Sequence, residues 1–129
     1  MQTVFTNEMT VHTWAAQSQE YGRNSSGSIF FDGDSIYSYG RHFKMSRFLT
    51  DRDNQKTALI TGARYSNTTA NHLHKVRMAM PSGVKVYTVE NPDAKTKPEH
   101  KANFAEIESR YKDSILRASR ARTYKQMAL

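Results

Sequence analysis

The sequence contains no cysteine among its 129 residues. This absence excludes a disulfide scaffold, thiol catalysis and zinc sites built on thiolates, and it fits a reducing compartment. No apolar run approaches about 18 residues, and the first residues lack both the basic and the apolar region of a secretory signal. We therefore expect neither a membrane span nor a secretory leader, and we expect a cytoplasmic protein.

Acidic residues are also few. Twelve Asp and Glu stand against 19 Lys and Arg, which gives a formal net charge of +7 and a sequence pI near 9.8. Small basic proteins commonly bind a polyanion or an acidic protein surface, although a positive charge can also serve solubility alone. The length fits one domain, and the 37% of hydrophobic residues allows a modest core.

The clearest strand signal is a hairpin. Ile29–Phe31 and Ile36–Tyr39 are rich in β-branched and aromatic residues, and an Asp-Gly pair at 32–33 lies between them. Such a pair supplies the positive φ that a tight reversal needs. Thr57–Tyr65 and the alternating segment Val84–Val89 indicate two further strands.

Two short helices are predicted beside these strands. The first covers Asn7–Ala16, with Asn7 as its N-cap and with apolar residues at helical spacing. The second covers Thr68–Met80, follows a cap at Ser66 or Asn67, and is stopped by proline.

Turn-forming residues predict a loop over 17–28, whereas 41–49 fits either an extended strand or a short helix. These elements together predict an α+β fold with a small, mostly antiparallel sheet of about four strands. The crossover from the third strand through the second helix to the fourth strand is long enough to be parallel, which would make the sheet mixed.

The last element is a long C-terminal helix. From Glu99 to about Gln126 there is no glycine or proline, so the helix would span about 42 Å, longer than the roughly 36 Å diameter of a globule of this size. We expect a core domain over 1–90, a linker over 91–98 and a basic helix over 99–129 that packs on the core, on a partner or on a second copy. An apolar stripe follows this helix: Phe104, Ile107, Tyr111, Ile115, Ala118 and Ala121.

Rings and cations alternate between residues 37 and 52. Single-stranded nucleic acid binds to such a combination, because cations contact phosphates and flat rings stack on bases. The alternative is that the rings fill the core while the cations face solvent, since strand alternation alone produces this pattern. The candidate binding residues here are Tyr37, Tyr39, Arg41, His42, Lys44, Arg47 and Arg52, with Phe43 as a further ring.

Two other basic stretches are candidates. Arg23 lies in the sequence GRNSSG over 22–27, where flexible backbone amides could cradle a phosphate, although a plain turn explains the same residues. No acidic residue follows Asp113, and the cations beyond it exceed what the helix dipole needs. We expect these to form an arm that contacts the nucleic-acid backbone: Arg117, Arg120, Arg122 and Lys125.

Metal and cofactor sites are not predicted. Asp32 and Asp34 flank a glycine, but the acids that a calcium loop requires do not follow them. His72 and His74 are two residues apart on a predicted helix, so they point in nearly opposite directions. No spacing brings two histidines together for acid–base catalysis, and we expect a binding protein rather than an enzyme. His42 would be the first candidate if an activity were found.

Four stretches carry a resemblance to a known family: WAAQSQ (14–19), RNSSGSIFFDGD (23–34), IYSYGRHF (36–43) and RYSNTTANH (64–72). Together they resemble a small domain of unknown function that recurs in proteins encoded by bacteriophages and plasmids. The resemblance covers about residues 10 to 80. It implies a mobile-element origin, a location in the host cytoplasm, and nucleic acid or a host factor as the partner.

These observations favour a phage-type, non-enzymatic protein that binds single-stranded DNA or RNA without strong sequence preference. Two other hypotheses remain. The protein could instead inhibit a host enzyme or defence complex, docking its basic face and the stripe of the last helix on that partner. It could also be a small metal-independent nuclease that uses His42 or the region of His72 and His74.

Overall fold

The structure is a computed structural model that describes residues 2–50, 54–63 and 66–109. The chain divides into two compact units, Met1–Asp93 and Ala94–Leu129. Each unit is described by itself.

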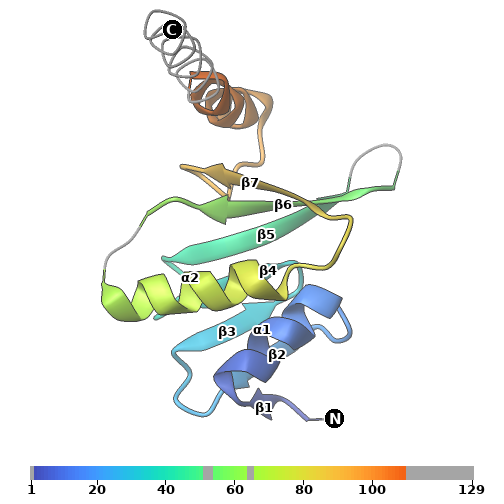
Figure 1. Cartoon of the computed structure of the whole chain (residues 1–129), viewed down its shortest axis with the longest axis vertical. Helices are drawn as coiled ribbons and strands as arrows, with labels where there is room; N and C mark the ends of the chain where they lie inside the picture. The colour runs from blue at the N-terminus through green and yellow to red at the C-terminus, as the bar shows by residue number, and fades with distance from the viewer. Residues whose placement is uncertain (1, 51–53, 64–65, 110–129) are drawn as a thin grey trace, which may run out of the picture. The chain divides into compact units, whose positions relative to one another are not determined.

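The first unit contains a seven-stranded sheet whose spatial order follows the order of the strands along the chain (Figure 1). Strands β2 to β6 are antiparallel to their neighbours, whereas the outermost pairs, β1 with β2 and β6 with β7, are parallel. The sheet is therefore mixed. The strands are β1 (Val4–Phe5), β2 (Tyr21–Asn24), β3 (Ile29–Asp32), β4 (Ser35–Ser38), β5 (Lys44–Thr50), β6 (Lys56–Thr61) and β7 (Lys85–Val89).

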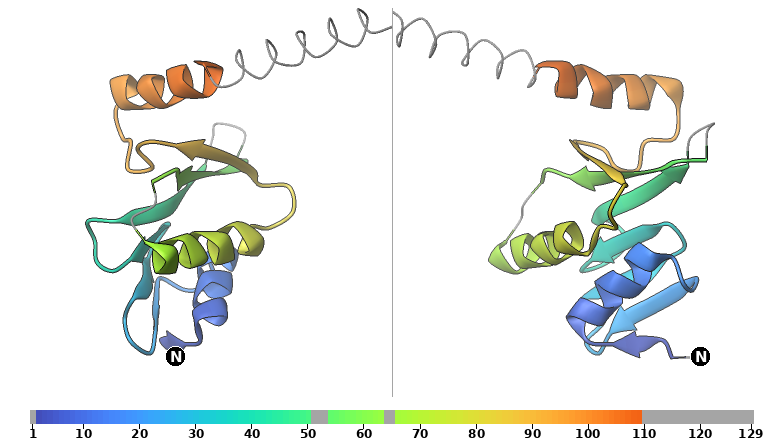
Figure 2. Two further views of the ribbon diagram at one scale, coloured as in Figure 1. Left: turned by 60° about the vertical axis from the view of Figure 1, so that its left-hand side comes forward. Right: turned by 45° about the vertical axis from the view of Figure 1, so that its right-hand side comes forward.

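Two helices, α1 (Asn7–Ala16) and α2 (Asn67–Ala79), pack on the same face of this sheet (Figure 2). The side chain of Thr6 accepts a hydrogen bond from Met9 N–H at the start of α1, and Ser66 caps α2 in the same way. Such caps satisfy backbone N–H groups that have no partner within the helix. In the described part of the first unit, no helix covers the opposite face of the sheet.

The hydrophobic core lies between the two helices and the sheet. Trp14 of α1 is fully buried, and its ring stacks on Phe48 of β5 with a centroid distance of 4.5 Å. Its indole N–H donates to the backbone carbonyl of Asp34 over 3.0 Å, which ties α1 to the β3–β4 turn. Alternation along β3 sends Ile29 and Phe31 into this core, so the intervening Phe30 lies on the helix-free face.

Several predictions from local pattern are confirmed. The α+β class and the mixed sheet hold, α1 has the predicted bounds, and Ser66 caps α2. The predicted cap of α1 was wrong: Thr6 is the N-cap, and Asn7 is the first residue of the helix. The predicted hairpin is β3–β4, and Gly33 takes the positive φ of 61° in its turn. The crossover β6–α2–β7 is parallel, as its length allows.

The expected number of strands was wrong, because the sheet has seven strands instead of about four. Tyr21–Asn24, predicted as loop, forms β2 because it pairs with β3 on one side and with β1 on the other. This pairing satisfies backbone groups that a turn would leave to water, and it overrides the turn preference of glycine and asparagine. The undecided segment 41–49 forms a short turn followed by β5.

The second unit contains a helix whose described part covers 97–109. Thr96 precedes it as the N-cap, because its hydroxyl accepts from the backbone N–H of Glu99 and donates to the Glu99 carboxylate. The rest of the predicted helix, from residue 110 on, lies outside the described residues. None of the helices in the described ranges is both long and apolar enough to cross a membrane.

Gly22 tests the packing of the strand that the sequence did not predict. A Cβ atom at Gly22 would lie 2.6 Å from the ring of the buried Phe31. We expect Gly22→Ala to lower the free energy of unfolding by about 1–3 kcal/mol, because the ring it would displace is fully buried in the core. Urea titration measures this loss. In a Phe31→Leu background the loss should shrink, and an unchanged loss would contradict the steric explanation.

Candidate nucleic-acid interface

Four neighbouring strands place one side chain each in a row across the helix-free face. Arg23 of β2 pairs with Phe30 of β3, Phe30 with Tyr37 of β4, and Tyr37 with Lys44 of β5. Directly paired residues of antiparallel strands lie on the same face, so the row reads cation, ring, ring, cation. We call these four residues the ring–cation ladder.

The two rings of the ladder stack on each other. Their centroids are 4.9 Å apart and their planes differ by 16°. The Arg41 guanidinium lies over both rings, 5.5 Å from the centroid of Phe30 and 5.7 Å from that of Tyr37, and the Lys44 ammonium lies 5.6 Å from the centroid of Tyr37. The result is a compact cluster in which cations flank and cover two stacked rings.

Two carboxylates pair with these cations. Arg41 lies 3.0 Å from the Asp32 carboxylate, and the hydrogen bond with Asp32 raises the pKa of Arg41. Lys44 lies 2.5 Å from the Asp93 carboxylate. The side chain of Arg41 is 64% exposed, and that of Asp32 is also open to solvent. Exposed ion pairs of this kind contribute little free energy, so a phosphate can replace the carboxylate at small cost.

Arg23 is partly engaged by its own backbone. Its Nη1 donates to the carbonyls of Asn24 and Ser25, each over 3.0 Å. The guanidinium has five N–H donors, and these two bonds leave further donors that can face a ligand. Arg23 therefore holds the β2–β3 turn and still presents charge beside Phe30.

The structure divides the predicted ring-and-cation segment between the two faces of the sheet. Phe43 and Phe48 are buried in the hydrophobic core, as the alternative interpretation expected for some of the rings. Arg47 is only 7% exposed, although the sequence placed it among the accessible cations, and its Nε has no hydrogen-bond partner among the described residues. The strand register places Tyr37, Lys44 and Arg47 on the helix-free face, but only Tyr37 and Lys44 join the ladder.

Tyr39 and His42 lie at the end of the sheet, in the β4–β5 connection. Tyr39 is 54% exposed, has a positive φ of 55°, and stacks on His72 of α2 with a centroid distance of 5.7 Å. His42 is exposed and lines a hollow of about 270 Å³ together with Arg41 and Lys44. His42 thus adjoins the ladder, whereas the ring of Tyr39 stacks on His72 of α2.

Phe30 is the residue of the ladder that sequence reasoning missed. The hairpin register pairs it with Tyr37, and its place between Ile29 and Phe31 puts it on the polar phase of β3. One signal could have identified it. The residue is aromatic, it lies at a solvent-facing position of its strand, and it pairs with a second ring across a tight hairpin.

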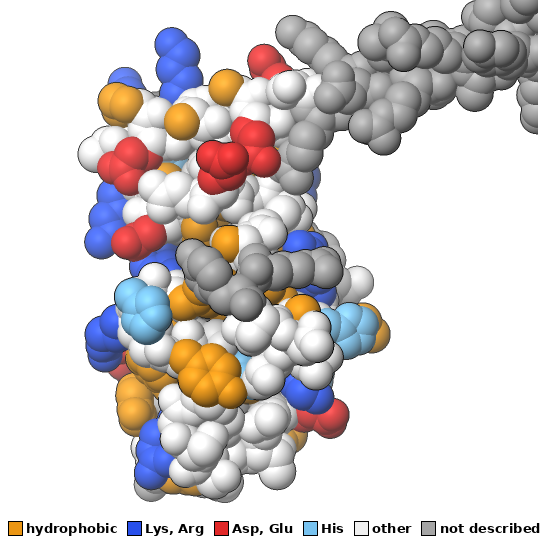
Figure 3. All heavy atoms as spheres, turned by 90° about the vertical axis from the view of Figure 1, so that its left-hand side faces the viewer, with side chains coloured by type: hydrophobic (Ala, Val, Ile, Leu, Met, Phe, Trp, Pro, Cys, Tyr) orange, Lys and Arg blue, Asp and Glu red, His pale blue; other side chains and the backbone are white. Residues whose placement is uncertain are grey.

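Charge is distributed unevenly along the chain. Met1–Asp93 has ten Lys and Arg against eight Asp and Glu, whereas Ala94–Leu129 has nine against four. In the view of Figure 3, lysines and arginines are scattered among other side chains and form no continuous basic patch. Five of the predicted binding residues lie outside the described residues: Arg52, Arg117, Arg120, Arg122 and Lys125.

The histidines of α2 differ in environment, as their spacing predicts. His72 is buried with its Nδ1 2.8 Å from the hydroxyl oxygen of Ser38, whereas His74 is exposed. Burial, and to a smaller extent the charge of Lys75, lowers the pKa of His72. Within the ranges that the structure describes, no three His, Asp or Glu side chains gather as a metal site would require.

No protein-family model, no curated protein and no solved structure matches this chain.

The buried His72 predicts how stability depends on pH. Its folded-state pKa lies below the ordinary value of 6.5, so below pH 6.5 the unfolded state binds more protons. We expect the free energy of unfolding to hold its full value above pH 6.5 and to decline as the pH falls below it.

Urea unfolding of the wild type and of His72→Gln over this range measures the effect. The glutamine variant should lack the part of the decline that His72 causes, since it has no titrating group there. Two parallel profiles would show that His72 does not titrate in the expected direction.

Proposed function

We propose that the protein binds single-stranded nucleic acid through the ring–cation ladder on the helix-free face of its sheet. The strongest support is the strand register, which sets two stacked rings between Arg23 and Lys44. Bases stack on aromatic side chains, and Lys and Arg contact the phosphates, so this order of groups suits an unpaired strand. Stacking requires no particular base, and the binding is therefore largely independent of sequence.

The direction of the bound strand follows from the ladder. Neighbouring β-strands lie about 4.8 Å apart, so the row from Arg23 to Lys44 extends over about 14 Å across the sheet. A nucleic-acid strand that crosses the β-strands meets a cation, the two rings and a second cation in turn. The hollow at His42 adjoins Lys44. Glu90 and Asp93 also line it, so we do not extend the path of the strand into it.

Binding a base requires Arg41 to move. Tyr37 is only 8% exposed, because Phe30, Arg41 and Lys44 surround its ring. The weak, exposed pair between Arg41 and Asp32 lets the guanidinium turn towards a phosphate, and a base can then take its place over the rings. Phe30 is half-buried and therefore more accessible than Tyr37.

The C-terminal unit adds the greater part of the net charge. Its excess of cations suits contact with the nucleic-acid backbone, which raises affinity for any sequence. We assign this part to the arm predicted at Arg117, Arg120, Arg122 and Lys125. The resemblance of residues 10 to 80 to a phage and plasmid domain supports the same class of function, in the cytoplasm of a bacterial host.

The stacking contribution is tested with Phe30→Leu. The change keeps an apolar side chain beside Tyr37 but removes a ring, and base–aromatic stacking contributes about 1–3 kcal/mol per base, so we expect the affinity to fall about fivefold or more. Fluorescence polarisation with labelled oligo-dT and oligo-U at about 50 mM salt measures it.

Tyr39→Leu is the matched control for Phe30→Leu. It removes an exposed ring that lies outside the ladder, and it should leave the affinity within about twofold of the wild type. Equal losses in the two variants, or no binding of any oligonucleotide by the wild type, would reject the ladder as the binding surface.

The phosphate contact of Arg41 is tested through salt. Each neutralised phosphate of a single strand contributes about 0.7 to the slope of log affinity against log salt concentration, so Arg41→Gln should reduce the slope by about that amount. Lys75→Gln removes one charge from the helix-covered face, where Lys75 pairs with Glu8, and should leave the slope unchanged. A common slope for both variants would mean that Arg41 contacts no phosphate.

A further inference from the structure

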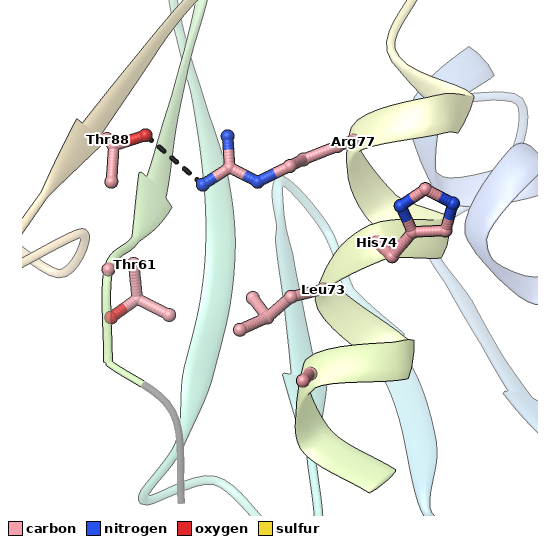
Figure 4. Close-up of a pocket in the computed structure, with 7 residues that line it drawn as sticks. Thr61, Leu73, His74, Arg77 and Thr88 are labelled. Carbon is pink, nitrogen blue, oxygen red and sulfur yellow. Dashed lines mark hydrogen bonds between the residues drawn. The ribbon is translucent and has the colours of Figure 1, made fainter. Parts of the chain in front are cut away.

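A second hollow lies on the other side of the sheet, where α2 leaves part of β6 and β7 uncovered (Figure 4). It has a volume of about 320 Å³, at the lower end of the range of small-molecule sites. The described residues that line it come from the C-terminal parts of the two parallel strands and from the outer side of the helix: Thr61, Gly62, Ala70, Leu73, His74, Arg77 and Thr88.

Arg77 dominates the electrostatics of this hollow. Its side chain extends from α2 towards β7, and its Nη2 donates to the hydroxyl of Thr88 over 3.2 Å (Figure 4). This bond fixes the direction of the guanidinium and uses one of its five N–H donors. His74, one helical turn before Arg77, adds a second nitrogen side chain to the lining.

The charge of Arg77 is not compensated nearby. Lys44 and Lys75, among the cations of the first unit, pair with carboxylates, as does Arg41. By contrast, Arg77 has no carboxylate partner within the described residues, and none of the described residues that line the hollow is acidic. A guanidinium with a neutral hydroxyl as its partner keeps its affinity for an oxyanion.

The floor of the hollow is apolar. Leu73 is buried and points from α2 towards the strands, and Ala70 lies one turn before it (Figure 4). The methyl group of Thr61 faces Leu73, while the hydroxyl oxygen of Thr61 accepts from the backbone N–H of Ala63. The hollow therefore has a cationic end and an apolar floor.

We propose that this hollow binds a small organic oxyanion, in which one phosphate or carboxylate group is attached to a compact apolar body. Arg77 holds the oxyanion with two parallel hydrogen bonds, and the body rests on Leu73 and the threonine methyl groups. The site is on the helix-covered side of the sheet, whereas the ring–cation ladder is on the helix-free side, so it does not depend on nucleic-acid binding.

The experiment is an NMR titration of the full chain, which follows the backbone amides and the Nε–H of Arg77. The probes are phenyl phosphate, benzoate and uncharged benzyl alcohol. We expect at least one anion to shift the Nε–H of Arg77 and the amides of Gly62, Leu73 and Thr88 below about 10 mM, and benzyl alcohol to bind more weakly. The stronger anion identifies phosphate or carboxylate as the natural group.

Variants then separate this site from general attraction of anions. Arg77→Met keeps the length and the helix preference of the side chain, and it should weaken anion binding by about tenfold or more, because hydrogen bonds to a charged group are lost. Lys85→Met removes an exposed charge on β7 that does not line the hollow, and it should bind the anion as the wild type does.

Three results would overturn the proposal: no shift with either anion, equal binding of benzyl alcohol, or equal losses in the two methionine variants. The Nε–H signal of wild-type Arg77 decides the matter even if the Arg77→Met variant does not fold.

Discussion

The packing of α1 and α2 on one face of the sheet is the constraint on which the rest of the structure depends. Strand alternation sends every second side chain to each face, and only the helix-covered face can build a deep core. Trp14 and Phe31 occupy that core and hold the helices in place. The alternate side chains of the same strands point to the helix-free face, and they include the rings and cations of the ladder.

In the ladder, the pairing register of the strands fixes where each cation lies relative to the rings. Net charge alone attracts nucleic acid without fixing its position. The first unit has nearly balanced charges, and ion pairs occupy Arg41 and Lys44 in the unbound state. The Arg41 pair is exposed and weak, so it preserves the position of the cation until a phosphate competes for it, whereas the Lys44 side chain is only 12% exposed. The C-terminal unit contributes bulk attraction, while the sheet contributes stacking, and the two contributions respond differently to salt.

The elements predicted correctly from the sequence are those that short-range interactions determine. A capping serine, an Asp-Gly turn and helical periodicity gave α1, α2, the hairpin and the parallel crossover. Strand β2 was missed because its glycine and asparagine favour turns, although it pairs with β3 across a short hairpin and with the distant β1. The burial of Arg47 was also not predicted. A register shift between Ile36 and Tyr37 places Lys44 and Arg47, three residues apart, on the same face, which regular alternation would forbid, so the sequence alone could not assign their faces.

The central claim is that an unpaired nucleic-acid strand lies on the helix-free face across β2 to β5. Photo-crosslinking of the full chain to an oligonucleotide with 5-bromouracil at every position, followed by peptide mapping, tests it most directly. The account predicts crosslinks in the peptides that contain Phe30 and Tyr37, and few or none in those of α1 and α2. Crosslinks concentrated on the two helices, or none in the sheet, would contradict it.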